Sequence, residues 1–197
     1  MNAVEENRKT FERIWNDIVK RPGQDEMLSW LTWNDFFTAP ASTRYHGAYP
    51  GGLAEHSLHV YERMLAKARD YDLETVTIIS LLHDVCKVNM YKENRRKEPG
   101  KLRTGEGESA GQQAPYRHED HFAIGHGEKS VILIQRHMRL TDEEIVAINW
   151  HMGGFDARAR QMSRELSRAW EEYPLAFLLH IADMEATWLD ERRDRCL

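Results

Sequence analysis

Residues 74–88, ETVTIISLLHDVCKV, decide the fold class of this chain of 197 residues. Apolar side chains fill successive positions of the segment, which therefore lacks the period of two expected of a half-exposed strand. We predict a largely buried helix from Glu74 to Val88. Its apolar run ends in the doublet His83-Asp84. Because burying an ionised carboxylate alone is costly, Asp84 needs a cationic partner or a metal ion.

Helical spacing of apolar residues recurs on both sides of this segment. We expect helices over residues 4–20, 25–40, 53–70, 127–138, 142–152, 157–171 and 174–191. Asp25 is the expected N-cap of the second helix. Residues 41–52, ASTRYHGAYPGG, are too rich in Gly, Pro and Ser to be regular. No segment alternates convincingly with a period of two, so the sequence predicts an all-α fold.

Residues 92–118 form a long, polar, glycine-containing connection. Such a loop inside a compact domain is usually functional or disordered, and we interpret it as an insertion beside the functional site. Residues 92–103 carry six basic and two acidic side chains, a local charge of +4 in a chain of net charge -5. This segment can grip the phosphates of a nucleotide or short oligonucleotide through Arg95, Arg96 and Lys97. The alternative is a solvated loop.

Length and composition limit the class of protein. A chain of 197 residues suits one compact domain, and an apolar share of 41% is too high for a disordered chain. The net charge of -5 gives no global positive field, so we expect no membrane partner and no stable binding of duplex DNA. Cys86 and Cys196 do not suggest a disulfide framework, and the N-terminus lacks the apolar core of a signal peptide. We expect a soluble, cytoplasmic protein of undetermined oligomeric state.

Several of the ten histidines lie in apolar context on predicted helices. His56 lies in GGLAEHSLHV, His126 in GHGEKS and His151 in AINWHMGG, while Asp183 follows in FLLHIADMEATW. A lone histidine of this kind is as often a hydrogen-bonded core or surface residue as it is a metal ligand. The order H…HD…H…H…D, with each member on or beside a separate helix, is more specific. Imidazole and carboxylate ligands suit Mn, Fe, Co, Ni or Zn, and the lack of a thiolate near the set disfavours a structural zinc site.

This order and its local strings resemble the HD-domain superfamily of metal-dependent phosphohydrolases. The resemblance covers about residues 39–191 and is strongest to stand-alone bacterial and phage HD hydrolases, through GHGEKSVILIQ and WHMGGFD. The segment FFTAPASTRYHGAYPGGLAEHS also looks like the HD domain attached to a bacterial 3′-to-5′ exoribonuclease family. The resemblance to the superfamily implies a single HD-domain helical bundle at residues 39–197, with the insertion at 92–118. A two-helix N-terminal extension at residues 1–38 would pack on that core.

The resemblance also implies a divalent-metal centre, with two ions favoured over one. The implied metal ligands are His56, His83, Asp84, His126, His151 and Asp183. The first ion would be held by His56, His83, Asp84 and Asp183. The second ion would be held by His126 and His151 and would share Asp84. Mn or Fe is favoured, with Mg, Co, Ni or Zn as alternatives. Two ions about 3.5–4 Å apart can activate a bridging water and clamp both oxygens of a phosphoester. In the rival, mononuclear arrangement these two histidines donate hydrogen bonds to the substrate phosphate.

Three further residues are candidates for contact with the substrate. Lys87 follows His83 by one turn, so a helix places it on the ligand face, where a cation can neutralise charge on the scissile phosphoryl group. The HDxxK pattern recurs in several HD branches, while the alternative is a lysine that stabilises its own helix C-terminus. Arg44 and His46, in the loop before the first ligand helix, can reach a substrate phosphate or serve as surface polar residues.

The resulting expectation is a divalent-metal-dependent phosphohydrolase of the phosphodiesterase or nucleotidase type. A metal-activated water would cleave a phosphoester or phosphoanhydride of a nucleotide, cyclic nucleotide or oligonucleotide, with Asp84 and Lys87 as catalytic residues. The alternative is an HD-fold regulatory protein that senses a phosphorylated ligand without turnover. The complete ligand set favours the enzyme. No nucleic-acid-binding domain of about 100 residues precedes the HD part, which favours a small substrate.

Overall fold

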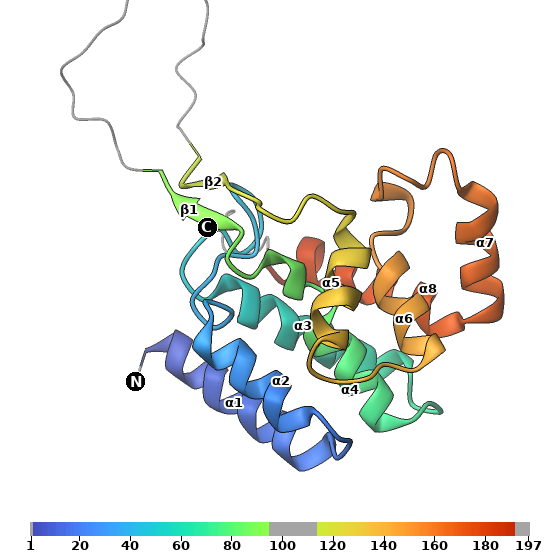
Figure 1. The fold of residues 1–197 in the computed structure, drawn as a ribbon, viewed down its shortest axis with the longest axis horizontal. Helices are drawn as coiled ribbons and strands as arrows, with labels where there is room; N and C mark the ends of the chain where they lie inside the picture. The colour runs from blue at the N-terminus through green and yellow to red at the C-terminus, as the bar shows by residue number, and fades with distance from the viewer. Residues whose placement is uncertain (1, 95–113, 192–197) are drawn as a thin grey trace, which may run out of the picture.

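The computed structural model describes residues 2–94 and 114–191, and their fold is mostly helical (Figure 1). This predominance of helix confirms the main feature of the predicted fold class. Eight α-helices run through the described residues: α1 (Ala3–Ile18), α2 (Gln24–Trp33), α3 (Gly52–Lys67), α4 (Leu73–Leu82), α5 (His126–Gln135), α6 (Asp142–Trp150), α7 (Ser163–Glu172) and α8 (Pro174–Glu185). None of these helices is both long enough and apolar enough to cross a lipid bilayer.

Three single turns and one pair of strands complete the described structure. The turns are η1 (Val85–Lys87), η2 (Gly153–Phe155) and η3 (Ala186–Asp190), of which η3 is π-helical. Strands β1 (Tyr91–Glu93) and β2 (Tyr116–His118) pair antiparallel, with Tyr91 opposite His118. The sequence predicted a loop throughout residues 92–118. Its two ends are more regular than predicted because they pair with each other through backbone hydrogen bonds.

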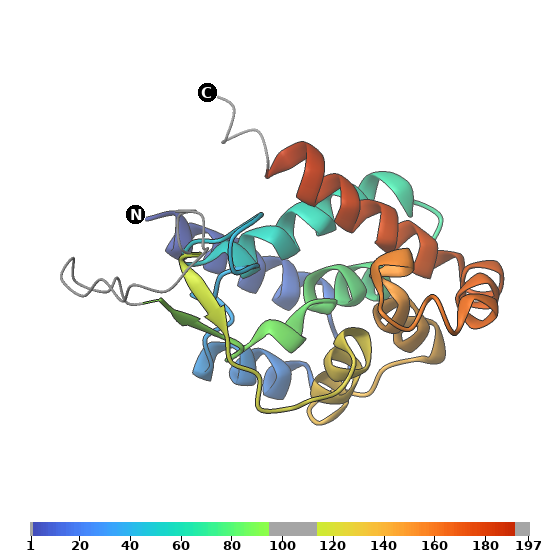
Figure 2. The same cartoon turned by 90° about the horizontal axis from the view of Figure 1, so that it is seen from above.

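One large cluster of buried apolar side chains joins the N-terminal helices to the rest of the molecule. Phe11 and Trp15 of α1 and Leu31 of α2 belong to the same cluster as residues of α3, α4 and α8. Helix α3 packs against α1, α4 and α8, and α6 packs against α4, α5 and α8. Figure 2 shows α8 running beside α3. Side chains on the facing surfaces of these helices are therefore held close together inside the bundle.

Local sequence accounts for where several helices begin. The first N–H groups of a helix lack intrahelical acceptors, and short polar side chains can supply them. The Asp72 carboxylate accepts the backbone N–H of Thr75 at 2.8 Å and so caps α4. Thr141 and Glu144 form a capping box at the start of α6. These caps fix the N-terminal ends of α4 and α6. His83 and His151 lie at the C-terminal ends of the same two helices.

The start of α2 differs from the prediction. Asp25 is not the N-cap, because α2 begins at Gln24 and the residue before it is Gly23. Gly23 has a φ of 92°, a left-handed conformation that favours glycine. A Cβ at this position would collide with the backbone of His137. The close approach of this turn to the segment after α5, rather than a side-chain cap, therefore determines where α2 begins.

The end of α2 also differs from the prediction. The helix ends at Trp33 rather than near residue 40. Phe36 and Phe37 turn inward instead, and both rings make edge-to-face contacts with Phe11. Trp33, the last residue of the helix, is 88% exposed. Burial of the two phenylalanines against α1 outweighs the local tendency to continue the helix.

The helix predicted over residues 157–171 begins only at Ser163. Arg158 holds the preceding turn, because its backbone N–H and its guanidinium both bind the Asp156 carboxylate, at 2.8 and 2.6 Å. The same guanidinium binds Glu128 of α5. These bonds hold residues 156–158 against α5 in a non-helical conformation.

Candidate metal centre

Helix α4 ends at Leu82, immediately before the His83-Asp84 doublet, and not at Val88 as predicted. His83 keeps helical dihedral angles, whereas Asp84 has left them, with φ -107° and ψ 16°. The Nδ1 atom of His83 donates to the Ser80 carbonyl at 2.8 Å, one of the carbonyls that the end of a helix leaves without an N–H partner. The break brings Lys87 back to the doublet, with its Nζ 2.6 Å from Asp84 Oδ2.

Three of the predicted ligand histidines are oriented in the same way. His83 donates through Nδ1 to a backbone carbonyl, and His151 does so to the Ile148 carbonyl at 2.7 Å. The Nδ1 atom of His56 donates to Glu191 Oε1 at 2.8 Å. A carbonyl or an ionised carboxylate can only accept, so Nδ1 of each of these rings carries a proton. The Nε2 atoms are thereby left for the interior, as in histidines that bind metals.

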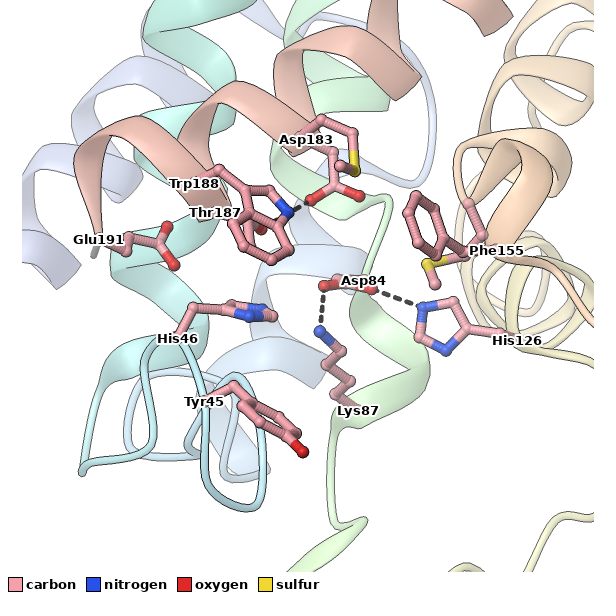
Figure 3. Close-up of a pocket in the computed structure, with 12 residues that line it drawn as sticks. Tyr45, His46, Asp84, Lys87, His126, Phe155, Asp183, Thr187, Trp188 and Glu191 are labelled. Atoms are coloured by element: carbon pink, nitrogen blue, oxygen red, sulfur yellow. Dashed lines mark hydrogen bonds and ion pairs between the residues drawn. The ribbon is translucent and has the colours of Figure 1, made fainter.

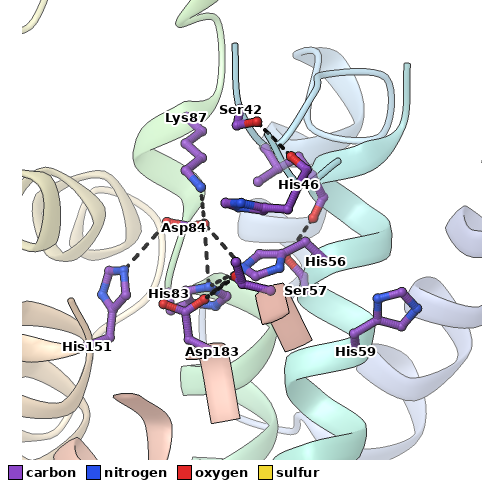
Figure 4. A network of polar contacts seen from close by, with 12 residues as sticks. Ser42, His46, His56, Ser57, His59, His83, Asp84, Lys87, His151 and Asp183 are labelled. Atoms are coloured by element: carbon purple, nitrogen blue, oxygen red, sulfur yellow. Dashed lines mark hydrogen bonds and ion pairs between the residues drawn. The ribbon is translucent and has the colours of Figure 1, made fainter. Parts of the chain in front are cut away.

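The Nε2 atoms and two carboxylates converge inside the bundle (Figure 4). Nε2 of His56 lies 3.3 Å from Nε2 of His83 and 3.2 Å from Asp183 Oδ1. The two oxygens of Asp84 face different partners. Oδ2 lies 3.5 Å from His83 Nε2, whereas Oδ1 lies 2.7 Å from His126 Nε2. The structure therefore brings all six predicted ligands together, with Asp84 between two groups of histidines.

Two of the possible ligand sets agree with this division. Donor atoms within 4.8 Å of one another occur in His56, His83 and Asp84, and in a second set that contains Asp84, His126 and His151. His83 and His151 also form such a set with Asp183. The side chains of His56, His83, Asp84 and His151 are almost completely buried. A carboxylate with one oxygen toward each set is placed so that two ions could share it.

The donor chemistry fits a cation at this position. If neutral, His56 and His83 would direct lone pairs at each other across 3.3 Å. The buried Nε2 of His151 has no hydrogen-bond partner, since Asp84 Oδ1 is 3.5 Å away. Facing acceptors of this kind need a proton or a metal ion between them. Nitrogen and carboxylate donors together suit the divalent transition metals.

The pKa values of two of these imidazoles are raised, because nearby anionic groups favour positive charge at this position. Burial alone would lower the pKa of His56, but the carboxylates of Glu191 and Asp183 outweigh it and raise this pKa to about 10. For His126, burial is likewise outweighed, by Cys86 and Asp84, and the pKa rises to about 10. Without a metal, the protein therefore holds protons on these rings, and a divalent ion would take their place.

The carboxylates of the centre remain ionised. Burial would raise the pKa of Asp84, but Lys87 and His83 outweigh burial and hold it well below its ordinary value. Burial is also outweighed at Asp183, where His56 is the main cause of a lowered pKa. The pKa of Glu191 is lowered in the same way by His56 and His59. Three negative charges are therefore available to bind cations at neutral pH.

Sequence reasoning assigned no role to Glu191, the last residue of the predicted C-terminal helix. Its side chain is 2% exposed, and Oε1 lies 2.8 Å from His56 Nδ1 and 3.2 Å from His59 Nδ1. The π-helical turn η3 immediately precedes it, and such turns are often found at functional sites. The only available signal was its spacing, since Glu191 follows Asp183 by about two helical turns. His59, one turn after His56, contacts the site through this carboxylate.

The expectation that no thiol lies near the ligand set is wrong. Cys86 is buried, and its Sγ lies 3.3 Å from Nδ1 and 3.5 Å from Nε2 of His126. The break after α4 turns the side chain of Cys86 toward α5. Among the described residues, the sets of donor atoms within 4.8 Å of one another do not include this sulfur. Cys86 therefore contacts the His126 ring without belonging to either ligand set.

A pocket of about 440 Å³ opens above the convergence point (Figure 3). Asp84, Lys87, His126 and Asp183 form its polar part. His46 and Glu191 also line it, and the His46 ring lies 5.1 Å from that of His56, centroid to centroid. The remaining lining residues are Tyr45, Met152, Phe155, Met184, Thr187 and Trp188.

The predicted substrate-binding residues have different positions. His46 lies in the pocket, and burial lowers its pKa to about 4, so this ring is neutral at physiological pH. Arg44 is exposed in the same loop and does not belong to the pocket lining. Arg95, Arg96 and Lys97 lie outside the described residues.

Glu191→Gln is expected to weaken Mn²⁺ binding about tenfold, since carboxylates that hold a ligating imidazole typically contribute this much. Glutamine can still accept from His56 Nδ1, but it removes the negative charge that makes the imidazole a stronger donor. Calorimetric titration of the metal-free protein measures the change. Glu185→Gln is the matched control, because this carboxylate lies near the end of α8 and binds Lys67 instead. Equal affinities for both variants would contradict the role given to Glu191.

Comparison of this chain with family models, curated proteins and solved structures finds no match. The functional argument consequently depends on the described side chains. Their arrangement combines a buried set of nitrogen and carboxylate donors, one buried ammonium group and an open pocket above them.

Proposed function

We propose that this chain is a divalent-metal-dependent phosphohydrolase of the HD-domain superfamily. One observation carries the proposal: the six side chains in the order H…HD…H…H…D meet around Asp84, whose two oxygens face different histidines. A structural role alone would require no such convergence of lone pairs. A pocket above these residues gives a substrate access to them.

The ligands divide into two groups that share one carboxylate. His56, His83 and Asp183 would hold one ion together with Asp84, while His126 and His151 would hold the other. When bound, divalent ions supply a water of lowered pKa and positive charge opposite the phosphoryl oxygens. A donor set rich in imidazole favours Mn or Fe over the oxygen-seeking Ca.

The chain itself supplies one further positive charge at the pocket. Burial would lower the pKa of Lys87, but Asp84 outweighs burial and raises it, so the ammonium remains protonated. Its Nζ lies 2.6 Å from Asp84 Oδ2, and the residue lines the pocket. Lys87 can thus donate to a phosphoryl oxygen while Asp84 holds its position. This donation stabilises the negative charge that grows on the phosphoryl group during hydrolysis.

The proposed activity is tested by a screen of the metal-loaded protein. Suitable compounds are an aryl phosphodiester, an aryl phosphomonoester, nucleoside triphosphates, cyclic dinucleotides and short RNA. Metal-dependent release of product from any one of them supports the proposal. Tight binding without turnover of any compound would instead support a regulatory protein that senses a phosphorylated ligand.

Removal of metal is expected to abolish hydrolysis. After complete chelation and removal of the chelator, Mn²⁺ or Fe²⁺ is expected to restore at least about tenfold more activity than Ca²⁺, because the centre is rich in histidine. Activity and metal content are measured on the same samples. Full activity in a sample shown to contain no metal would exclude the proposed mechanism.

A further inference from the structure

The pocket above the metal centre has an aromatic rim. Tyr45 is 64% exposed, Phe155 65% and Trp188 45%, and all three line the same pocket. They come from three separate segments: the loop before α3, η2 and η3. Large apolar groups gathered on an exposed surface are typical of a binding site. Met152 and Met184 add flexible apolar surface that adapts to a ligand.

The aromatic rings surround the polar part of the pocket. In Figure 3, Tyr45 and Phe155 lie on opposite sides of Asp84, and Trp188 lies on the side of Asp183. A phosphate bound near Asp84 would therefore have an aromatic side chain on each side of it. Flat rings such as nucleobases stack on such side chains without hydrogen-bond readout.

The charges of the pocket limit how many phosphates it can hold. Three carboxylates line it, from Asp84, Asp183 and Glu191, whereas Lys87 is the one lysine or arginine among the described lining residues. Even two divalent ions would leave an excess of only two positive charges. That excess matches one phosphate group and is too small for a polyphosphate chain.

We propose that the substrate is a phosphodiester with an uncharged aromatic group, such as a nucleobase, on at least one side, and that polyphosphates bind poorly. The assignment rests on the proposed phosphohydrolase function. The phosphate lies over the metal ligands and Lys87, and its aromatic substituent stacks on the rim formed by Tyr45, Phe155 and Trp188.

Binding tests this assignment independently of turnover. The probes are thymidine 5′-monophosphate, methyl phosphate and thymidine 5′-triphosphate, titrated into the Mn²⁺-loaded protein at constant free Mn²⁺. We expect the thymidine monophosphate to bind at least tenfold more tightly than methyl phosphate and more tightly than the triphosphate. Equal affinity for the first two, or tightest binding of the triphosphate, would overturn the assignment.

Variants locate the preference on the rim. Tyr45→Ala and Phe155→Ala are each expected to reduce the ratio of the two monophosphate affinities at least threefold. Trp33→Ala is the matched control, because this exposed tryptophan lies at the end of α2 and does not line the pocket. An unchanged ratio in both rim variants would overturn the assignment of the rim.

Turnover separates this inference from the proposed function. The two substrates are thymidine 5′-(p-nitrophenyl) phosphate and methyl p-nitrophenyl phosphate, which share a leaving group and differ in the base. A kcat/KM at least tenfold higher for the thymidine ester supports the inference. Equal values for both esters would overturn it while leaving the phosphohydrolase function intact. If neither ester is hydrolysed but the binding preference holds, the aromatic subsite is supported and hydrolysis of these diesters is refuted.

Discussion

Asp84→Asn is expected to reduce hydrolysis by about three orders of magnitude or more and to reduce metal content. The carboxylate is 2% exposed, and its two oxygens face different groups of histidines. An amide presents one oxygen and one NH₂ group, so it cannot accept from both sides. Loss of this carboxylate would remove a ligand from both proposed ions and so weaken their binding and the hydrolysis that depends on them. Steady-state rates and elemental analysis of the purified variant measure both effects.

The substitution also leaves the buried ammonium of Lys87 without its carboxylate partner, which costs about 3–5 kcal/mol in typical buried pairs. The double variant with Asp84→Asn and Lys87→Met removes both charges and is expected to recover stability without recovering activity. Glu144→Gln is a control for the loss of a buried, paired carboxylate, since Glu144 binds Arg21 far from the pocket. Activity in the double variant near that of the original chain would refute a role for Asp84 in catalysis.

His126→Ala is expected to lower the metal content from two ions toward one per chain and to reduce turnover at least about a hundredfold. Nε2 of His126 lies 2.7 Å from Asp84 Oδ1, and its side chain is 29% exposed, so truncation disturbs the core little. The ion held by His56, His83, Asp84 and Asp183 would keep all of its ligands. Elemental analysis after loading with excess Mn²⁺ counts the ions, and circular dichroism checks the helical content.

A mononuclear centre gives a different result. The original chain would then hold one ion, and His126→Ala would keep that ion while losing turnover, because the histidine would donate to the substrate phosphate. His118→Ala is the matched control, since this exposed histidine lies on β2 and belongs to neither ligand set. One ion in both the original chain and the variant would exclude the two-ion arrangement.

The apolar run of α4 shows how much of the fold the sequence predicts. A continuous run of apolar residues correctly predicted a buried helix, because burial and local propensity favour the same structure there. The break after Leu82 was not predicted. At this break, the imidazole of His83 binds the Ser80 carbonyl, one helical turn earlier. A side-chain bond of this kind leaves no trace in the hydrophobic periodicity of the sequence.

The phenylalanines after α2 illustrate the opposite case. Phe36 and Phe37 continue the apolar spacing of the preceding helix, so the sequence alone favoured extending it. Their contacts with Phe11 decide the structure instead, and these contacts join residues far apart in the chain. Local periodicity carries no information about such partners, because tertiary packing can override it.

The sequence also predicted only some of the residues of the candidate site. The six candidate ligands were predicted because each lies in a recognisable local string, and the structure places these side chains close together. Glu191 was missed because its role depends on His56, 135 residues earlier in the chain. Cys86 was placed away from the ligands because its contact with His126 follows from the unpredicted break after α4. The residues of the aromatic rim carry no local signal, since their grouping is a property of the folded chain.

The bond between His56 and Glu191 has a consequence for biosynthesis. Because 135 residues separate these two side chains, the centre cannot assemble during translation until almost all of the described chain has left the ribosome. Before then, His83 and His151 can each bind a carbonyl three residues earlier, so their rings are oriented locally. Capture of a metal ion would thus follow docking of α8 and would lock the last helix onto the first ligand helix.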